Sequence, residues 1–303
     1  MISVSLFRRL AFLTAFFAYL QIALGGVVRV SGSGLGCPDW PLCHGRPYPA
    51  PDIHSIIEYS HRTVGSITGL LVILTVIGAW IVFARRRPVV PIIATASLLA
   101  IGVEGALGGL VVMQELQPWL VLVHLGLAMI ILGCLLATAI LALPASAGIH
   151  EGRLRGLVIA AAVGTYVMLL TGSSVVASGA DQSCRSWPLC AGGFALDFSG
   201  ANAFTMLHRG AVLVIGAFIV YAIHAAMKQA ALRPVAIFTL VVLALQIAVG
   251  AGAALTDLGF FNGLHVAIAT LVWSGMLSIA LLTASRSDRV TIATGLSAGK
   301  EPA

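Results

Sequence analysis

The chain has 303 residues, of which 59% are hydrophobic and only 9% are charged. Soluble proteins carry about 25% charged residues, so this composition excludes a soluble fold and indicates an integral membrane protein. The formal net charge of +6 is explained by a bias of Lys and Arg toward one side of the membrane, and we find no basic patch typical of nucleic-acid binding.

Apolar runs of about 20 residues, the length that a transmembrane helix requires, occur eight times. The runs cover residues 10–30, 57–83, 89–112, 119–142, 156–177, 204–226, 234–256 and 261–284. We therefore predict an all-α integral membrane protein with eight transmembrane helices in the lipid bilayer. Arg8 and Arg9 precede the first run as in a signal peptide, but the fifth run leads into a similar cysteine loop. We therefore expect the first run to be retained as a helix.

The first half of the chain carries polar groups near the ends of these runs. A loop with Cys37 and Cys43 follows the first run. Glu58 and His61 are three residues apart at the start of the second run, so both side chains share one helix face. Glu104 lies within the third run, where it would serve either in a proton route or in a hydrogen bond between helices.

The second half repeats this pattern at a constant distance of 147 residues. The matched pairs are Cys37 and Cys184, Cys43 and Cys190, His61 and His208, and Arg62 and Arg209. A shared offset indicates an internal duplication, with residues 1–150 and 151–303 as two four-helix bundles. Because four helices return the chain to its starting side, the two bundles have parallel topology.

Lys and Arg are distributed unequally between the two sides of the membrane. Twelve of the 17 lie on the side of the two termini. Cytoplasmic loops are enriched in Lys and Arg, so we expect a cell-membrane protein with both termini in the cytoplasm and both cysteine loops outside. An oxidising outer compartment favours disulfides, and the simplest pairs are Cys37–Cys43 and Cys184–Cys190. Each pair would either brace its loop or act as a redox-active thiol pair.

Four histidines lie at similar depth near the outer ends of the even-numbered helices. They are His61, His124, His208 and His265. Ionisable groups within a membrane usually face the interior or a cavity and mark function. Two histidines from two helices can ligate a haem iron from both faces, so each half offers one haem site. The alternative is that each histidine only forms a hydrogen bond between helices.

Other residues near these histidines suit the same ligand. Arg62 and Arg209 directly follow two of the histidines, and an Arg pairs with carboxylates such as haem propionates through two parallel hydrogen bonds. Glycines would let helices approach each other or make room for a flat ligand. The candidates are Gly25, Gly26, Gly102, Gly105, Gly108, Gly109, Gly250 and Gly252.

The two halves differ at a few polar positions. Glu58 corresponds to Thr205, and Arg29 corresponds to Val176. Glu58 would accept a proton or orient His61, or it would only stabilise the helix N-terminus. Arg29 is an additional candidate for cofactor binding. We expect the first half to carry out chemistry and the second half to hold a haem for electron transfer or structure.

Five segments together resemble one family, haem A synthase. They are SGSGLGCPDWPLC in the first outer loop, EYSHRTVG at the start of 57–83, VLVHLGLAM in 119–142, MLHRG in 204–226 and GLHVAIA in 261–284. The resemblance covers nearly the whole chain, and the paired cysteine loops resemble the bacterial branch with two loop disulfides. It implies an enzyme that oxidises a methyl substituent of haem O to a formyl group, through hydroxylation and loss of water.

The resemblance also implies roles for individual residues. His208 and His265 would hold a resident haem b, and His61 and His124 would hold the haem O substrate. Glu58 matches the family's glutamate at this place, and the first cysteine pair is the one implicated in activity. Haem O synthase is implied as the supplier, and a membrane electron donor such as quinol as a partner. The family commonly reads Gln-like at the position of Glu104, whose role therefore stays open.

Three other functions use part of the same pattern. A di-haem b-type membrane cytochrome linked to quinol would transfer electrons through the same four histidines but would not need Glu58. A transporter with parallel repeats would place polar residues and broken helices at mid-membrane, where we find only Glu104 and Gln246. A disulfide-exchange membrane enzyme would need reactive cysteines but no histidines.

Overall fold

The computed structural model describes residues 2–144, 152–190, 195–256 and 258–297, with side chains described up to residue 283. Within these residues the secondary structure is helical, apart from an isolated bridge between Cys43 and Arg46. The helices are α1 (Val4–Val30), α2 (Ile53–Phe83), α3 (Val89–Met113), α4 (Pro118–Leu141), α5 (Gly152–Ala177), α6 (Ala180–Ser183), α7 (Asn202–Met227), α8 (Arg233–Leu255) and α9 (Gly259–Ser297).

In the described part of the chain, eight helices are long and apolar enough to cross a membrane, and only the four-residue α6 is not. Large apolar side chains such as Leu99, Leu213 and Val214 remain exposed along these helices. Such side chains suit contact with lipid, where the backbone must be satisfied within each helix. The prediction of an all-α protein with eight transmembrane helices is confirmed.

The first two helices begin earlier than the apolar runs predict, because polar caps fix their first turns. The Ser3 side chain accepts the Leu6 amide at 3.1 Å and caps α1. The Asp52 carboxylate accepts the Ser55 amide at 3.0 Å and caps α2. Such caps satisfy amides that have no partner within the helix, but hydropathy does not reveal them. As a result, Glu58 lies in the second turn of α2 rather than in the first.

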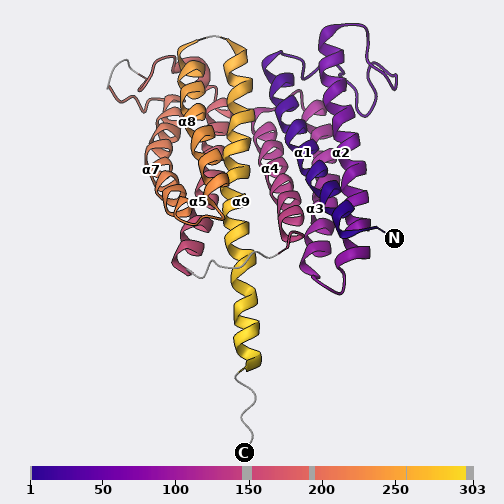
Figure 1. The fold of residues 1–303 in the computed structure, drawn as a ribbon. Coiled ribbons are helices and arrows are strands. Elements are labelled where there is room, and N and C mark those ends of the chain that lie inside the picture. Colours follow the sequence, from indigo (N-terminus) through magenta and orange to yellow (C-terminus); the bar gives the residue numbers. More distant parts are fainter. Residues whose placement is uncertain (1, 145–151, 191–194, 257, 298–303) are drawn as a thin grey trace, which may run out of the picture.

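The helices form two groups that lie side by side (Figure 1). One group is α1 to α4, the other contains α5, α7 and α8, and α9 lies between them. Helix α9 packs against α8 and α5 and also against α1 and α4 of the other group. The two cysteine-containing loops lie at the same end of the molecule, at the top of Figure 1.

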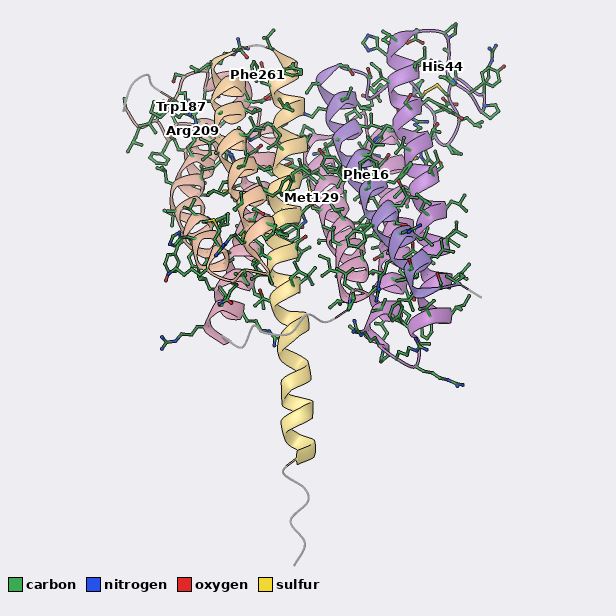
Figure 2. All side chains as sticks on the ribbon, viewed as in Figure 1. Phe16, His44, Met129, Trp187, Arg209 and Phe261 are labelled. Carbon is green, nitrogen blue, oxygen red and sulfur yellow. A yellow bond between two sulfur atoms is a disulfide. The ribbon has the colours of Figure 1, made fainter. Side chains whose placement is uncertain are left out.

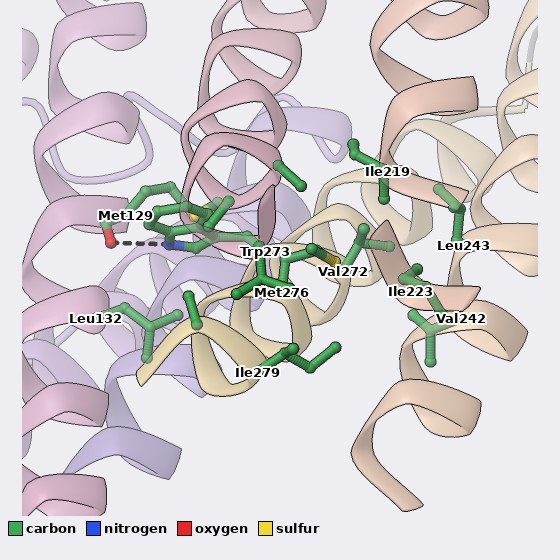
Figure 3. Close-up of a cluster of buried hydrophobic side chains, with 14 of the residues drawn as sticks. Met129, Leu132, Ile219, Ile223, Val242, Leu243, Val272, Trp273, Met276 and Ile279 are labelled. Atoms are coloured by element: carbon green, nitrogen blue, oxygen red, sulfur yellow. Dashed lines mark hydrogen bonds between the residues drawn. The ribbon is translucent and has the colours of Figure 1, made fainter. Parts of the chain in front are cut away.

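One buried core joins the two groups (Figure 3). It contains Met129 and Leu132 of α4 together with Trp273 of α9. The indole nitrogen of Trp273 donates a hydrogen bond to the Met129 carbonyl at 3.1 Å, and the rings of Tyr166 and Trp273 lie 5.5 Å apart. Packing of this kind is what holds transmembrane helices together, so the larger of the two buried clusters is shared by both groups of helices.

We expect Trp273→Ala to destabilise the protein by about 3 kcal/mol, because it leaves a cavity in this shared core. The measurement is the midpoint of thermal unfolding in detergent. Trp80→Ala is the matched control, since the Trp80 side chain is half exposed. An equal loss of stability in the two variants would contradict the prediction.

Candidate functional site

The four histidines predicted as ligands lie within the first three turns of their helices. His61 is on α2, His124 on α4, His208 on α7 and His265 on α9. His61 and His124 lie close enough to interact electrostatically. The same holds for His208 and His265. The structure therefore brings the histidines together in two pairs, one in each half of the chain.

Each histidine ring packs against a glycine of the neighbouring helix. A Cβ atom added at Gly25, Gly108, Gly172 or Gly250 would lie 3.2, 3.2, 2.9 or 2.9 Å from the Cε1 atom of His61, His124, His208 or His265, respectively. An alanine at any of these positions would press on the ring. The glycines belong to α1, α3, α5 and α8, so each neighbouring pair of helices joins one glycine to one histidine.

Polar side chains lie beside the histidines of the first half. The Gln21 amide nitrogen is 3.2 Å from His61 Nε2. A carboxylate oxygen of Glu104 is 3.1 Å from His124 Nδ1, although the two groups are not aligned for a hydrogen bond. The structure thus places Glu104, whose role the sequence left open, next to a predicted ligand.

The second half has the same arrangement with different side chains. The Thr171 hydroxyl lies 3.0 Å from His208 Nδ1. The Gln246 amide nitrogen lies 3.1 Å from both ring nitrogens of His265. Gln246 therefore lies beside His265 in the second half, as Glu104 lies beside His124 in the first. The side chain beside the histidine is an uncharged amide in the second half and a carboxyl group in the first.

The histidine pairs suit a metal ion that is already held in a macrocycle and needs few ligands from the protein. Several buried polar atoms around them have no hydrogen-bond partner among the described residues. They are Gln21 Oε1, His61 Nδ1, Glu104 Oε2, His124 Nδ1 and Gln246 Oε1. The described residues also include no group of three or more His, Cys, Asp or Glu side chains that could hold a bare metal ion. Two histidines per half fit the axial ligation of a haem, whose macrocycle supplies the other ligands.

Glu58 lies between the first histidine pair and the first cysteine loop. Its side chain is buried, with 3% of the residue exposed. One carboxylate oxygen accepts the Cys37 backbone amide at 2.7 Å, and the other pairs with Arg62. These contacts fix the direction of a carboxylate that shares a helix face with His61.

The first cysteine loop is closed by a disulfide between Cys37 and Cys43. Asp39 tightens the loop further, because its carboxylate accepts the amides of His44 at 2.6 Å and Gly45 at 2.7 Å. The hydrogen bond from Gly45, with that from His44, holds the pKa of Asp39 below its usual value. The second disulfide joins Cys184 and Cys190. Both predicted pairs are confirmed, and Figure 2 shows His44 and Trp187 of the two loops at the same end of the molecule.

The arginines predicted to bind propionates have partners within the protein, to different degrees. Arg62 donates to Glu58 and to three loop carbonyls. Arg29 lies 3.4 Å from Asp181, which belongs to the second half. Arg209 makes one hydrogen bond, to the Pro188 carbonyl at 2.9 Å, among the residues described. Among the described residues, Arg29 and Arg209 each make one side-chain hydrogen bond, so both keep more donors for a ligand than Arg62 does.

Comparison with known proteins agrees with this site. The sequence profile of the COX15-CtaA family, described as cytochrome oxidase assembly protein, matches residues 8–277. The chain belongs to this family. The heme A synthase of Geobacillus kaustophilus (strain HTA426) is 29% identical over 290 residues, which cover 91% of this chain and 90% of that protein. The heme A synthase of Shouchella clausii (strain KSM-K16) is 32% identical over 217 residues, or 69% and 72% of the two chains.

The COX15-CtaA match confirms the family resemblance predicted from five segments. It runs from α1 into α9 and so includes all four histidines, both cysteine loops and Glu58. The individual roles assigned to these residues remain predictions. The match nevertheless indicates that these polar residues belong to a family pattern and are not a chance collection in apolar helices.

Some residues of the site were not predicted from the sequence. Gln21 carried a signal, because an amide within the apolar run 10–30 is costly unless it has a partner in the interior. Thr171 carried none, since an intrahelical Thr commonly bonds its own backbone, and Thr171 also donates to the Met168 carbonyl at 2.7 Å. Asp181 lies in α6, a short helix that no apolar run marks.

We expect Gly250→Ala to lower the affinity of the second half for haem by about tenfold, because the added methyl group displaces the His265 ring. The measurement is haem titration of the purified protein, followed by absorbance. Gly216→Ala is the matched control, because a Cβ atom at Gly216 would meet no atom within 4 Å. Equal affinities in the two variants would show that the glycine contact does not position the ring.

Proposed function

We propose that the protein is a haem A synthase, a membrane enzyme that oxidises a methyl substituent of haem O to a formyl group through hydroxylation and loss of water. One observation carries the proposal. Two histidine pairs are seated against helix glycines in the same way, yet among the described residues only the first pair has a buried carboxylate, Glu58, on the same helix face as one of its rings. Two equivalent haem sites would suit electron transfer, whereas a site with an additional carboxylate suits a haem that is the substrate.

The second half, residues 151–303, holds a resident haem b through His208 and His265. Thr171 and Gln246 keep the two rings in position through contacts with their nitrogens. Arg209 uses its remaining donors to hold a propionate. The bound haem supplies the iron redox chemistry that amino-acid side chains lack.

The first half, residues 1–150, binds the haem O substrate through His61 and His124. Glu104 lies beside Nδ1 of His124, where a small rotation would let its carboxyl group accept a hydrogen bond from the ring and orient it. Glu58 lies one helix turn before His61 and is held by the Cys37 amide and by Arg62. It therefore presents a fixed carboxylate that accepts a proton during oxidation of the methyl group.

The second half lacks an equivalent base. Thr205 occupies the position that corresponds to Glu58, and its buried hydroxyl has no hydrogen-bond partner among the described residues. A hydroxyl does not accept a proton at neutral pH as a carboxylate does. The second half therefore binds its haem without reacting with it.

The protein is a multi-pass membrane protein, and we propose a finer placement. It lies in the cytoplasmic membrane with both termini in the cytoplasm and both cysteine loops outside, because Lys and Arg gather at the end that carries the termini. Haem O synthase supplies the substrate, whose long apolar tail reaches the site from the bilayer. The hydroxylation also needs an oxidant, molecular oxygen in this proposal, and a membrane donor such as quinol supplies the electrons and protons that reduce its second oxygen atom to water.

We expect Glu58→Gln to abolish haem A formation, because the amide keeps the shape of the carboxylate but cannot accept a proton. The haem b content should stay unchanged. Product is measured by mass spectrometry of haems extracted from cells that make haem O. Glu115→Gln, at an exposed turn, is the control. Normal haem A output from Glu58→Gln would remove Glu58 from the mechanism.

The proposed function is tested by identifying the haems that copurify with the protein from cells supplied with haem O. We expect haem b together with haem O or its oxidised products. His208→Ala should lose haem b, because one of the two side chains that would hold it is removed, while His224→Ala, at the far end of α7, should keep it. Haem b alone would support an electron-transfer cytochrome instead. Absence of any haem would overturn both.

A further inference from the structure

Arg62 and Arg209 lie at equivalent positions of the two halves but make different hydrogen bonds. Arg62 donates to the Cys37 carbonyl at 2.7 Å, to Asp39 at 2.8 Å and to Leu42 at 2.7 Å, and it also pairs with Glu58. Arg209 donates only to the Pro188 carbonyl at 2.9 Å among the described residues. Two guanidinium nitrogens of Arg62 make its hydrogen bonds, so Arg62 is tied to the first cysteine loop at several points.

The loop that Arg62 holds packs next to the helix glycine that supports His124. The bonded carbonyls lie on both sides of Trp40, and the Trp40 ring packs on α3, where a Cβ atom at Gly109 would lie 2.9 Å from its Cδ2 atom. The preceding residue, Gly108, is the one that receives the His124 ring. The tip of the loop therefore rests beside the glycine that supports a predicted ligand.

The start of the loop packs closely on the first residues of α2. A Cβ atom at Gly36 would lie 2.4 Å from the backbone carbon of His54, and the Ser55 hydroxyl donates to the Gly36 carbonyl at 2.6 Å. Cys37 and Cys43 are both 0% exposed. The disulfide is thus covered from both sides as long as the loop stays in place.

Glu58 depends on the same contacts. Its two oxygens are held by the Cys37 amide and by Arg62, so a loop that moved away would take one partner with it. Charge-assisted hydrogen bonds are stronger than neutral ones, and all the bonds that Arg62 makes are of this kind. No described contact gives Thr205 a similar connection to the second loop.

We propose that Arg62 is a positioning residue that latches the first outer loop over the His61–His124 half and keeps Glu58 aligned. Propionate recognition is left to Arg209, which has free donors. The assignment of this half to haem O rests on the proposed function, whereas the latch itself rests on the contacts of Arg62.

The test measures how fast each disulfide is reduced in the purified full-length protein. The protein is pulsed with a phosphine reductant, freed thiols are labelled with a maleimide, and the labelled cysteines are identified by mass spectrometry. Arg62→Gln should speed reduction of Cys37–Cys43 by about tenfold or more, because several charge-assisted hydrogen bonds are lost. Reduction of Cys184–Cys190 in the same molecules should not change.

Two further variants separate a latch from a general loss of structure. Arg62→Lys keeps the charge but not the planar fork, so it should restore part of the protection. Arg209→Gln should leave Cys37–Cys43 as slow as in the unaltered protein. Arg62→Gln should also keep its haem b absorbance while losing haem A formation.

Equal reduction rates of Cys37–Cys43 in the unaltered protein and in both Arg62 variants would overturn the latch. Faster reduction of both disulfides in Arg62→Gln would do the same, because it would indicate global loosening. The rates are obtained whether or not the protein makes haem A. Failure of the latch and failure of the proposed function are therefore distinguishable.

Discussion

Close packing of a histidine ring on a helix glycine is the contact on which the rest of the site depends. An ionisable group in lipid is costly unless it faces the protein interior, and here the ring can turn inward only where the neighbouring helix has no Cβ atom. The contact recurs at Gly25, Gly108, Gly172 and Gly250. It therefore lets each of four helix pairs approach closely around a histidine ring, and the other polar side chains of the site lie beside these rings.

On this common frame the halves differ in charge rather than in shape. A carboxyl group lies beside a histidine where the other half has an amide, as with Glu104 and Gln246. The same holds for Glu58, whose counterpart Thr205 is uncharged. Because a charge within a membrane must be paired or held by hydrogen bonds, Glu58 brings its own support, the Cys37 amide and Arg62. The support of this carboxylate consequently also ties the first cysteine loop to α2.

The sequence predicts the spans well, because a span needs about 20 apolar residues. A constant offset relates His61 to His208 without any knowledge of the fold, while the role of these histidines as ligands stays a prediction. The partners of Arg62 could not be predicted, since its acceptors are backbone carbonyls and every residue has one. The contact between Glu104 and His124 depends on how α3 is rotated against α4, which packing decides. The helix caps at Ser3 and Asp52 could not be predicted from the apolar runs, because hydropathy detects only the apolar part of a helix.

The shared core around Trp273 and Met129 has a consequence for the two histidine pairs. In the terms used for assemblies, the molecule resembles an obligate heterodimer carried on one chain, because buried apolar side chains of both groups line their interface. The two histidine pairs are thus carried on helices that pack on one shared core. Under the proposed function, an electron passing between the halves would cross a distance set by this packing, with no encounter between mobile carriers.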